Sequence, residues 1–313
     1  MRTLFGIGAI GETIKGIQQT LTQAGFDTKG ADGFYGQNTA TAVMAFQSAR
    51  SLAVTGTLED GSWQLLMQRP VPTVGDRCLQ LTANFEGHGF GLAMGNFDGA
   101  LLTWGIIGFT MASGEVQSIV LAVNQSSPGS VQEAFGSSMP ELLKLMEASK
   151  ADQQTWADEH TLPNGGLAQP WRTMFATFGS FPEVQQEQLK HVRDDYLNPA
   201  IQTAKKLGFT TELGLALCFD IHVQNGGIKR AAMARIQQQS QPNIAEADLR
   251  QIVANAVADV ARLKFREDVR RRKLTVATGQ GSVHGHNFDL ENWGLSDQFD
   301  AEELSQASLR VSA

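Results

Sequence analysis

Two carboxylates stand twelve residues apart in the sequence, in surroundings that differ as acid–base chemistry requires. Glu86 closes an apolar helical stretch that starts near Leu79, whereas Asp98 lies in a loop flanked by glycine. Burial at the end of an apolar helix favours the protonated form of a carboxyl, which a general acid needs. Water and backbone amides in a loop keep a carboxylate ionised, which a base needs. We therefore take Glu86 as the candidate acid and Asp98 as the candidate base.

Other kinds of chemistry find less support in the residue pattern. His222, His284 and His286 lack the His-x-x-x-His spacing and the accompanying carboxylate of a zinc site, so we expect no metal and no cofactor. The chain has no Gly-x-Ser-x-Gly elbow, and neither Cys78 nor Cys218 has a base nearby in sequence, which disfavours covalent acyl transfer. We expect the two cysteines to be buried free thiols.

The sequence around the carboxylates predicts mostly helical elements. Residues 184–207 carry apolar residues near one face, and residues 212–223 are apolar almost all round, as in a buried central helix. A longer helix is predicted from Asn243, with Glu246 as a capping-box partner, through to Leu263. Only residues 101–109, β-branched and aromatic, indicate strand. The predicted larger domain is mostly α with a small β element.

The predicted central helix contains one charged residue, Asp220. An unpaired charge there would cost several kcal/mol or lose its proton, so we expect an Arg or amide partner and a supporting role in the catalytic core. The basic run 270–273 is interpreted as structural or as a solvated face at a helix end, since cations favour the C-terminal end of the helix dipole.

The first seventy residues predict a three-helix domain. A helix over Ile14 to Leu21 stops at Ala24-Gly25, a glycine-rich loop follows, and two more helices start near Asn38 and after Asp60. The string that carries a family resemblance is Asp32-Gly33-x-x-Gly36-x-x-Thr39-x-x-Ala42-Val43-x-x-Phe46-Gln47, with Thr55-Gly56 and Trp63-x-x-Leu66. It resembles the peptidoglycan-binding module of cell-wall hydrolases.

Prolines mark the end of this module. Arg69-Pro70-Val71-Pro72-Thr73 cannot continue a helix and is typical of a short semi-rigid spacer. We predict a peptidoglycan-binding domain at residues 1–69, a linker at 70–75, a glycosidase domain at 76–296 and a polar C-terminal tail at 297–313. The predicted fold class is mainly α: a small three-helix N-terminal domain and a larger lysozyme-like α+β domain.

A second resemblance covers the candidate carboxylates. The pattern Asp98-Gly-x-x-x-Thr103-x-Gly105-Ile106-Ile107-Gly108-Phe109, ending at Ser113-Gly114-Glu115, is similar to the signature of the glycoside hydrolase family 46 chitosanases, within the lysozyme-like superfamily. The stretches 215–226 and 288–295 also resemble that family. The resemblance implies that Glu86 is the acid, that Asp98 activates water, that Thr103 positions this water and that Glu115 helps to bind sugar.

Departures from the family pattern bear on the substrate. Glu86 and Asp98 are closer in sequence than usual, Ala100 replaces an arginine, and Leu101-Leu102 replace aromatic residues. His88 and Trp104 are further candidates for contact with sugar, although glycine-rich loops often carry a solvated His and aromatic residues often belong to a core. We predict the carboxyl separation of an inverting enzyme, about 6.5 to 9.5 Å, which admits a water.

The bulk composition bears on partners and location. A net charge of -7 and a pI near 5.4 give no reason to expect nucleic-acid binding, and no apolar window is long enough to span a membrane. We recognise no signal peptide, so we expect synthesis in the cytoplasm and action on the wall or periplasm after release through a holin or a secretion system. A monomer is expected, with an immunity protein as partner if the chain is a secreted effector.

Three functions fit these observations. The first is a peptidoglycan-degrading glycosidase, an antibacterial lysozyme-like endolysin or effector that the module brings to the wall. The second is a chitosanase that has acquired the module. The third is a non-catalytic wall-binding protein. The mild net charge and the lost arginine favour peptidoglycan over chitosan, because a cleft for a cationic polymer should be strongly acidic.

Overall fold

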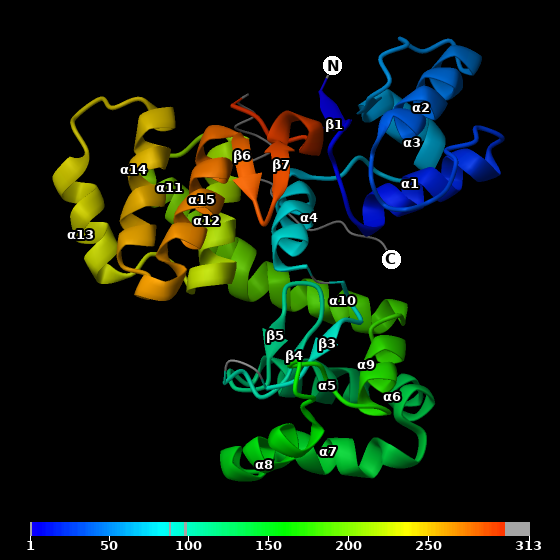
Figure 1. Cartoon of the computed structure of the whole chain (residues 1–313), viewed down its shortest axis with the longest axis vertical. Helices are drawn as coiled ribbons and strands as arrows, with labels where there is room; N and C mark the ends of the chain where they lie inside the picture. The colour runs from blue at the N-terminus through cyan, green and yellow to red at the C-terminus, as the bar shows by residue number, and fades with distance from the viewer. Residues whose placement is uncertain (1, 88, 97–98, 298–313) are drawn as a thin grey trace. The chain divides into compact units, whose positions relative to one another are not determined.

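The computed structural model describes residues 2–87, 89–96 and 99–297, and these residues are mainly helical (Figure 1). They fall into two compact units. Within the described residues, the first unit combines residues 2–85 with residues 195–297, and the second comprises residues 86–194. No described helix has the length and apolar character needed to cross a membrane. The expected fold class, mainly α with small sheets, is confirmed.

The N-terminal part of the first unit contains the three predicted helices. Its elements are β1 (Thr3–Phe5), α1 (Glu12–Gln23), α2 (Gln37–Ala49), β2 (Leu58–Glu59) and α3 (Asp60–Met67). The unexpected strands β1 and β2 pair antiparallel. Gln47 has no exposed surface: its amide donates to the Thr57 carbonyl at 2.7 Å and accepts from the Thr55 and Gly56 N–H groups at 3.0 Å. This buried amide fixes the turn before β2.

The rest of the first unit is a helical bundle closed by a hairpin. Its elements are α4 (Val74–Glu86), α11 (Asn198–Leu207), α12 (Glu212–Asn225), α13 (Arg230–Gln239), α14 (Glu246–Asp259), η3 (Leu263–Phe265), α15 (Arg266–Thr278), β6 (Gln280–Val283), β7 (His286–Asp289) and η4 (Leu290–Trp293). Ten consecutive residues of α12, from Glu212 to Ile221, are buried. The predicted buried central helix is therefore present, packed against α11, α14 and α15.

The helix predicted to reach Leu263 ends earlier. α14 stops at Asp259, and the next helix, α15, begins only at Arg266. Leu263 fits the apolar spacing but is 79% exposed. Glu246 does not cap its own helix. Its carboxylate accepts from the backbone N–H groups of Thr210 and Thr211 at 2.8 and 3.2 Å, immediately before α12.

A buried charge cluster joins α12 to α15. Asp220 has no exposed surface and accepts from Arg272 at 2.6 Å and from Lys273 at 2.5 Å, and Thr82 of α4 donates to it at 3.3 Å. Burial alone would raise the pKa of Asp220, but the charges of Arg272 and Lys273 outweigh burial and lower it to about 2. The expected cationic partner of Asp220 is confirmed.

The basic run lies inside α15 rather than at its end. Arg272 and Lys273 are buried beside Asp220, while Arg271 is exposed. A structural role for the run was expected and is present for these two residues, but a solvated face at a helix end was wrong for them. Cys78 and Cys218 are buried free thiols as expected, and burial raises the pKa of both.

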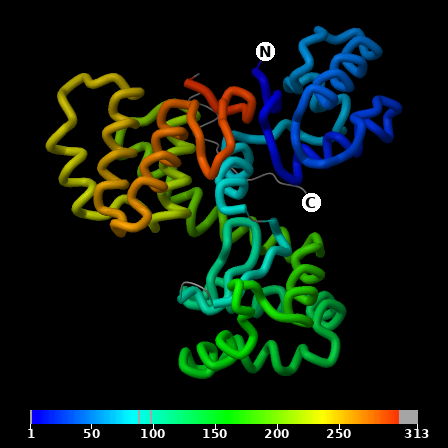
Figure 2. The backbone as a smooth tube through the Cα atoms, in the orientation of Figure 1, coloured from blue at the N-terminus to red at the C-terminus, as the bar shows by residue number. Residues whose placement is uncertain are grey.

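A second buried carboxylate fastens the start of the chain to the bundle. Glu212, 4% exposed, pairs with Arg77 and with Arg2, and it accepts from the Ser296 N–H at 3.0 Å. The Gly6 N–H donates to the Asn292 carbonyl at 3.1 Å, and a Cβ at Gly6 would meet the Asn292 side chain at 2.3 Å. Residues 2–6 therefore run against η4, as the tube in Figure 2 shows.

The second unit surrounds a three-stranded antiparallel sheet of order β3-β4-β5. Its elements are β3 (Ala93–Met94), β4 (Thr103–Trp104), β5 (Phe109–Thr110), α5 (Glu115–Ser126), α6 (Pro128–Phe135), η1 (Gly136–Ser138), α7 (Met139–Glu147), α8 (Lys150–His160), α9 (Trp171–Phe178) and α10 (Pro182–His191). A π-helical stretch, η2 (Val192–Leu197), follows α10. The strand predicted over 101–109 is thus the hairpin β4-β5.

Replacing Asp220 by Asn should destabilise the fold by about 3–5 kcal/mol, because Arg272 and Lys273 would keep their burial and lose their counter-charge. Chemical denaturation measures this loss. Asp248→Asn, at an exposed position in the first turn of α14, is the matched control and should change stability little.

The same variant should show a defined pH dependence. The folded-state pKa of Asp220, about 2, lies below the ordinary value of 3.8, so its stabilisation is complete above about pH 4 and is lost as the pH falls towards 2. The stability gap between wild type and Asp220→Asn should therefore narrow over that interval. A gap that stays constant down to pH 2 would contradict the assigned ion pair.

Candidate active site

Glu86 is the last residue of α4. It is half-buried, its Oε1 atom is buried, and Gly87, with φ of +67°, ends the helix immediately after it. The preceding residue, Phe85, packs on the Phe288 ring with centroids 4.9 Å apart, and the Arg272 guanidinium lies 5.0 Å from the Phe85 ring. The carboxyl thus projects from the end of an anchored helix, as the sequence predicted.

Thr110 of β5 connects Thr103 with Glu115, because it pairs with the first and donates a hydrogen bond to the second. Thr103, 8% exposed, begins the central strand β4 and lies opposite Thr110 of β5. The Thr110 N–H donates to Glu115 Oε2 at 3.1 Å, and the Ser113 hydroxyl donates to the same oxygen at 2.6 Å. Glu115 is also the first residue of α5, where the helix dipole favours a negative charge. Two candidate residues are therefore held on adjoining parts of one framework.

Asn96 holds the backbone of Gly99 and Leu101, which follow Asp98 in the sequence. The Asn96 side-chain oxygen accepts from the Gly99 N–H at 3.1 Å and from the Leu101 N–H at 3.2 Å, while its amide donates to Asp158 at 3.1 Å. Leu101 has φ of +67°, a conformation rare for a residue with a side chain, so the loop stores local strain. Asp98 and His88 themselves lie outside the described residues.

The turn of the β4-β5 hairpin shows why the sequence signature contains glycine. Gly105 has φ of +93°, and a Cβ there would meet the Gln188 side-chain oxygen at 2.6 Å. That oxygen accepts from the Ile106 N–H at 3.0 Å, and the Gln188 amide donates to the Phe90 carbonyl at 3.0 Å. Gln188 has no exposed surface. It ties the hairpin turn to the loop that follows Glu86.

Trp104 is a core residue, which corrects its assignment as a sugar contact. It has no exposed surface, its indole N–H donates to the Phe175 carbonyl at 3.2 Å, and its ring stacks on Phe178 with centroids 5.5 Å apart. A side chain enclosed in this way cannot touch a polymer. Its apolar area instead holds β4 against α9.

Among the histidines considered as metal ligands, His222 and His284 have different partners. His222 shares a hydrogen bond of 2.9 Å with the Thr203 hydroxyl, and burial lowers its pKa. His284 lies 3.2 Å from Asp268. Within residues 2–87, 89–96 and 99–297, no group of three or more His, Cys, Asp or Glu side chains is placed to hold a metal ion.

Comparisons with known proteins match both parts of the chain. The family model described as Glycosyl hydrolase family 46 matches residues 88–274, and the one described as a putative peptidoglycan binding domain matches residues 10–66. No curated protein matches the chain. The family 46 match covers more than half of the chain, so the protein belongs to glycosyl hydrolase family 46. It is a glycoside hydrolase that also carries a peptidoglycan-binding domain.

Solved structures show the same fold at low sequence identity. A mutant chitosanase from Bacillus subtilis complexed with 6 GlcN has a TM-score of 0.51 and 18% identity, over 68% of this chain and 95% of its own. A family 46 chitosanase from Gynuella sunshinyii, in complex with chitotetraose, has a TM-score of 0.50 and 20% identity, over 69% of this chain and 96% of its own. These likenesses establish the fold of the catalytic part.

Sequence reasoning missed Asn96 and Gln188. Asn96 follows Gly95, and asparagine and glycine are both common in turns, but nothing in the sequence indicates that the Asn96 side-chain oxygen accepts from residues 99 and 101. Gln188 lies in a polar stretch of α10 and reads as a surface residue, although it is buried. Neither residue does chemistry, yet each fixes backbone next to a candidate catalytic residue.

Asn96→Ala should lower kcat about tenfold with KM less affected, because residues 99 and 101 would lose the acceptor that fixes them beside Asp98. Steady-state kinetics and a thermal melt on the same preparation separate this loss from unfolding. Asn124→Ala, which removes an amide from α5 of the same unit, should leave kcat unchanged. Equal losses in both variants would show that Asn96 matters only for folding.

Proposed function

We propose that this family 46 enzyme hydrolyses a glucosamine-rich polymer of the chitosan type by an inverting mechanism. The carrying observation is the distribution of charge between the two units. Residues 86–194 contain twelve Asp and Glu against five Lys and Arg, so the entire net charge of -7 belongs to the second unit, and the rest of the chain has twenty of each. A local acidic excess attracts a cationic polymer.

The position of the net charge in the chain matters more than its total. The whole-chain charge of -7 looked mild for an enzyme of a cationic polymer, which favoured peptidoglycan. Confined to the unit that carries Thr103 and Glu115, the same charge is high for about a hundred residues. The family match also favours chitosan as the substrate class, as do the solved chitosanases in complex with 6 GlcN and with chitotetraose.

The proposed mechanism uses two carboxyl groups in one displacement. Glu86 donates its proton to the glycosidic oxygen as the bond to the anomeric carbon breaks, so the leaving sugar departs as an alcohol. A water attacks the anomeric carbon from the opposite face, and Asp98 accepts the proton that this water loses. The products are two shorter chains, the new reducing end has inverted configuration, and the two carboxyl groups have exchanged protonation states.

The remaining residues act by orientation and charge. The Thr103 hydroxyl, on the central strand, is proposed to hold the attacking water in line with the anomeric carbon, which contributes order rather than acidity. Glu115 is proposed to bind a sugar ammonium or hydroxyl. Its Oε2 atom already accepts from Thr110 and Ser113, which fixes the direction of the carboxylate.

Glu86→Gln should lower kcat on chitosan by about 10²–10⁴-fold, because the amide keeps the shape of the side chain and has no proton to transfer. Reducing-end release measures the loss, and proton NMR of early wild-type products should show the inverted anomer. The matched control is Glu133→Gln, an exposed carboxyl on α6 of the same unit, which should keep full activity. Full activity of Glu86→Gln would refute the acid assignment.

Peptidoglycan is the second candidate substrate, favoured by the domain matched at residues 10–66. The two candidates predict different salt responses. Hydrolysis of chitosan should exceed hydrolysis of purified sacculi at low salt and should fall as salt is raised, because screening weakens the attraction between the acidic unit and a cationic polymer. Products from sacculi alone would favour peptidoglycan, and products from neither would favour a non-catalytic wall-binding protein.

The wall-binding domain also bears on the biological setting. A glycosidase joined to such a domain fits action at the bacterial wall, and we propose an endolysin as its role. A holin gene beside the gene for this chain would support that role. An immunity-protein gene in the same position would instead indicate a secreted antibacterial effector.

A further inference from the structure

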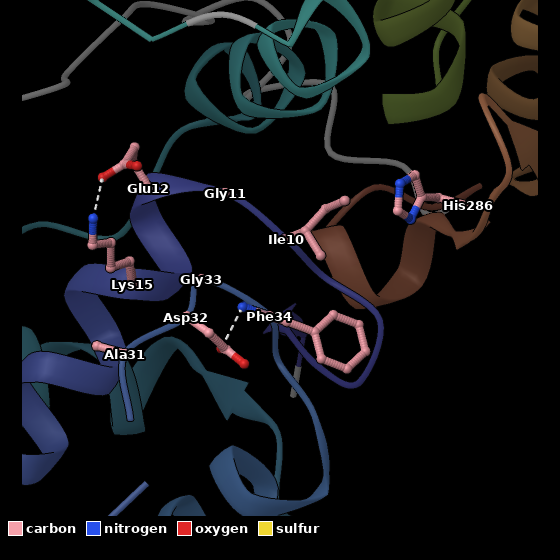
Figure 3. A pocket seen from close by; sticks show the side chains of 9 residues that line it. All are labelled: Ile10, Gly11, Glu12, Lys15, Ala31, Asp32, Gly33, Phe34 and His286. Carbon is pink, nitrogen blue, oxygen red and sulfur yellow. Dashed lines mark hydrogen bonds and ion pairs between the residues drawn. The ribbon is translucent and has the colours of Figure 1, made fainter. Parts of the chain in front are cut away.

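A cavity of about 570 Å³ opens on the first unit, beside the start of α1. Figure 3 shows the side chains that line it, which come from residues 10–15, from residues 31–34 and from His286 of β7. None of these residues belongs to the candidate active site. A volume of this size falls within the range of small-ligand pockets.

The cavity presents an apolar platform. Phe34 is 49% exposed, and the half-exposed Ile10 is bridged to it through the backbone. An aromatic ring left this open at a concave surface is typical of a binding site, because burying the ring in the protein or under a ligand would be favourable. The apolar face of a pyranose ring is a suitable partner for such a platform.

Charged groups stand around this platform. Asp32 and Glu12 supply carboxylates, and Lys15 lies 3.9 Å from Glu12 in a loose, largely exposed pair. Hydrogen bonds from the Gln18 side chain and from the Phe34 N–H lower the pKa of Asp32, so this carboxylate is ionised at neutral pH. Carboxylates beside an aromatic face suit a ligand that carries both ammonium and hydroxyl groups.

The buried Gln18 side chain holds the loop that carries Asp32 and Phe34. Gln18, 2% exposed, donates to the Asp32 carboxylate at 2.8 Å and to the Phe34 carbonyl at 3.0 Å, and it accepts from the Gly33 N–H at 2.8 Å. Gly11, with φ of +121°, and Gly33 form a floor of bare backbone, since a Cβ at Gly33 would lie 3.1 Å from the Gly11 carbonyl. The platform is therefore ordered before any ligand arrives, which lowers the entropic cost of binding.

We propose that this cavity is a binding site for a glucosamine oligomer, built jointly by the wall-binding domain and the C-terminal hairpin. A sugar ring packs on Phe34, its ammonium group meets Asp32 or Glu12, and His286 contacts a hydroxyl from the other side. The choice of amino sugar rests on the proposed function, because the site is then a second point of attachment for the enzyme's own substrate. The whole pocket exists only where the domain and the hairpin are both present.

The test measures retention of the full-length chain on insoluble chitosan, with Glu86→Gln in every protein so that the polymer is not consumed. Phe34→Ala and His286→Ala should each weaken retention about five- to tenfold. Phe265→Ala removes a comparably exposed ring, 46% against 49%, from outside the pocket and should bind as the parent does. Thermal melts establish that each variant is folded.

Two outcomes would overturn the proposal in distinct ways. If folded Phe34→Ala and His286→Ala are retained on chitosan as well as the parent is, the pocket does not bind chitosan. If these variants bind purified sacculi more weakly but bind chitosan unchanged, the ligand of the pocket is a component of the wall and not a glucosamine oligomer. If Phe34→Ala does not fold, His286→Ala decides, because it lies outside the wall-binding domain. Hydrolysis of soluble glucosamine hexamer by the wild-type chain is measured separately, so that failure of the proposed function is recognised by itself.

Discussion

The central helix of the first unit depends on a buried charge being matched. Asp220 lies where nothing is exposed to water, and it is stable there only because Arg272 and Lys273 reach it from α15 and Thr82 reaches it from α4. The same Arg272 lies over the Phe85 ring, one residue before Glu86. One electrostatic cluster therefore holds α12 and α15 together and anchors the end of the helix that presents the candidate acid.

In the second unit, two side-chain amides fix the backbone beside the candidate site. Asn96 and Gln188 each satisfy backbone groups on loops beside the candidate site, and Gly105 is required because a side chain there would collide with Gln188. Neutral amides suit this position because they order a loop without adding charge to it.

The sequence predicts those parts of the fold that depend on a local residue pattern. A stretch that is apolar almost all round predicted α12, and the burial of that helix implied an Arg or amide partner for Asp220. Turn glycines and core positions identified the N-terminal domain. The signals failed where tertiary context decides. Leu263 extends an apolar period but is exposed after the helix has ended. Trp104 has the chemistry of a sugar platform but is enclosed by Phe175 and Phe178. The two-residue strands β2 and β3 are not predicted, because neither lies in an extended β-branched or aromatic run like the one that indicates the β4-β5 hairpin.

The wall-binding domain is attached to the bundle at two places in the chain. Residues 70–73 lead from it into α4, and residues 2–6, which precede its matched segment, lie against η4, with Gly6 too close to Asn292 to tolerate a side chain. Arg2 and Arg77 then meet on the same Glu212. A domain transplanted into another enzyme would therefore need an N-terminal strand that fits the recipient's C-terminal segment as well as a matching linker.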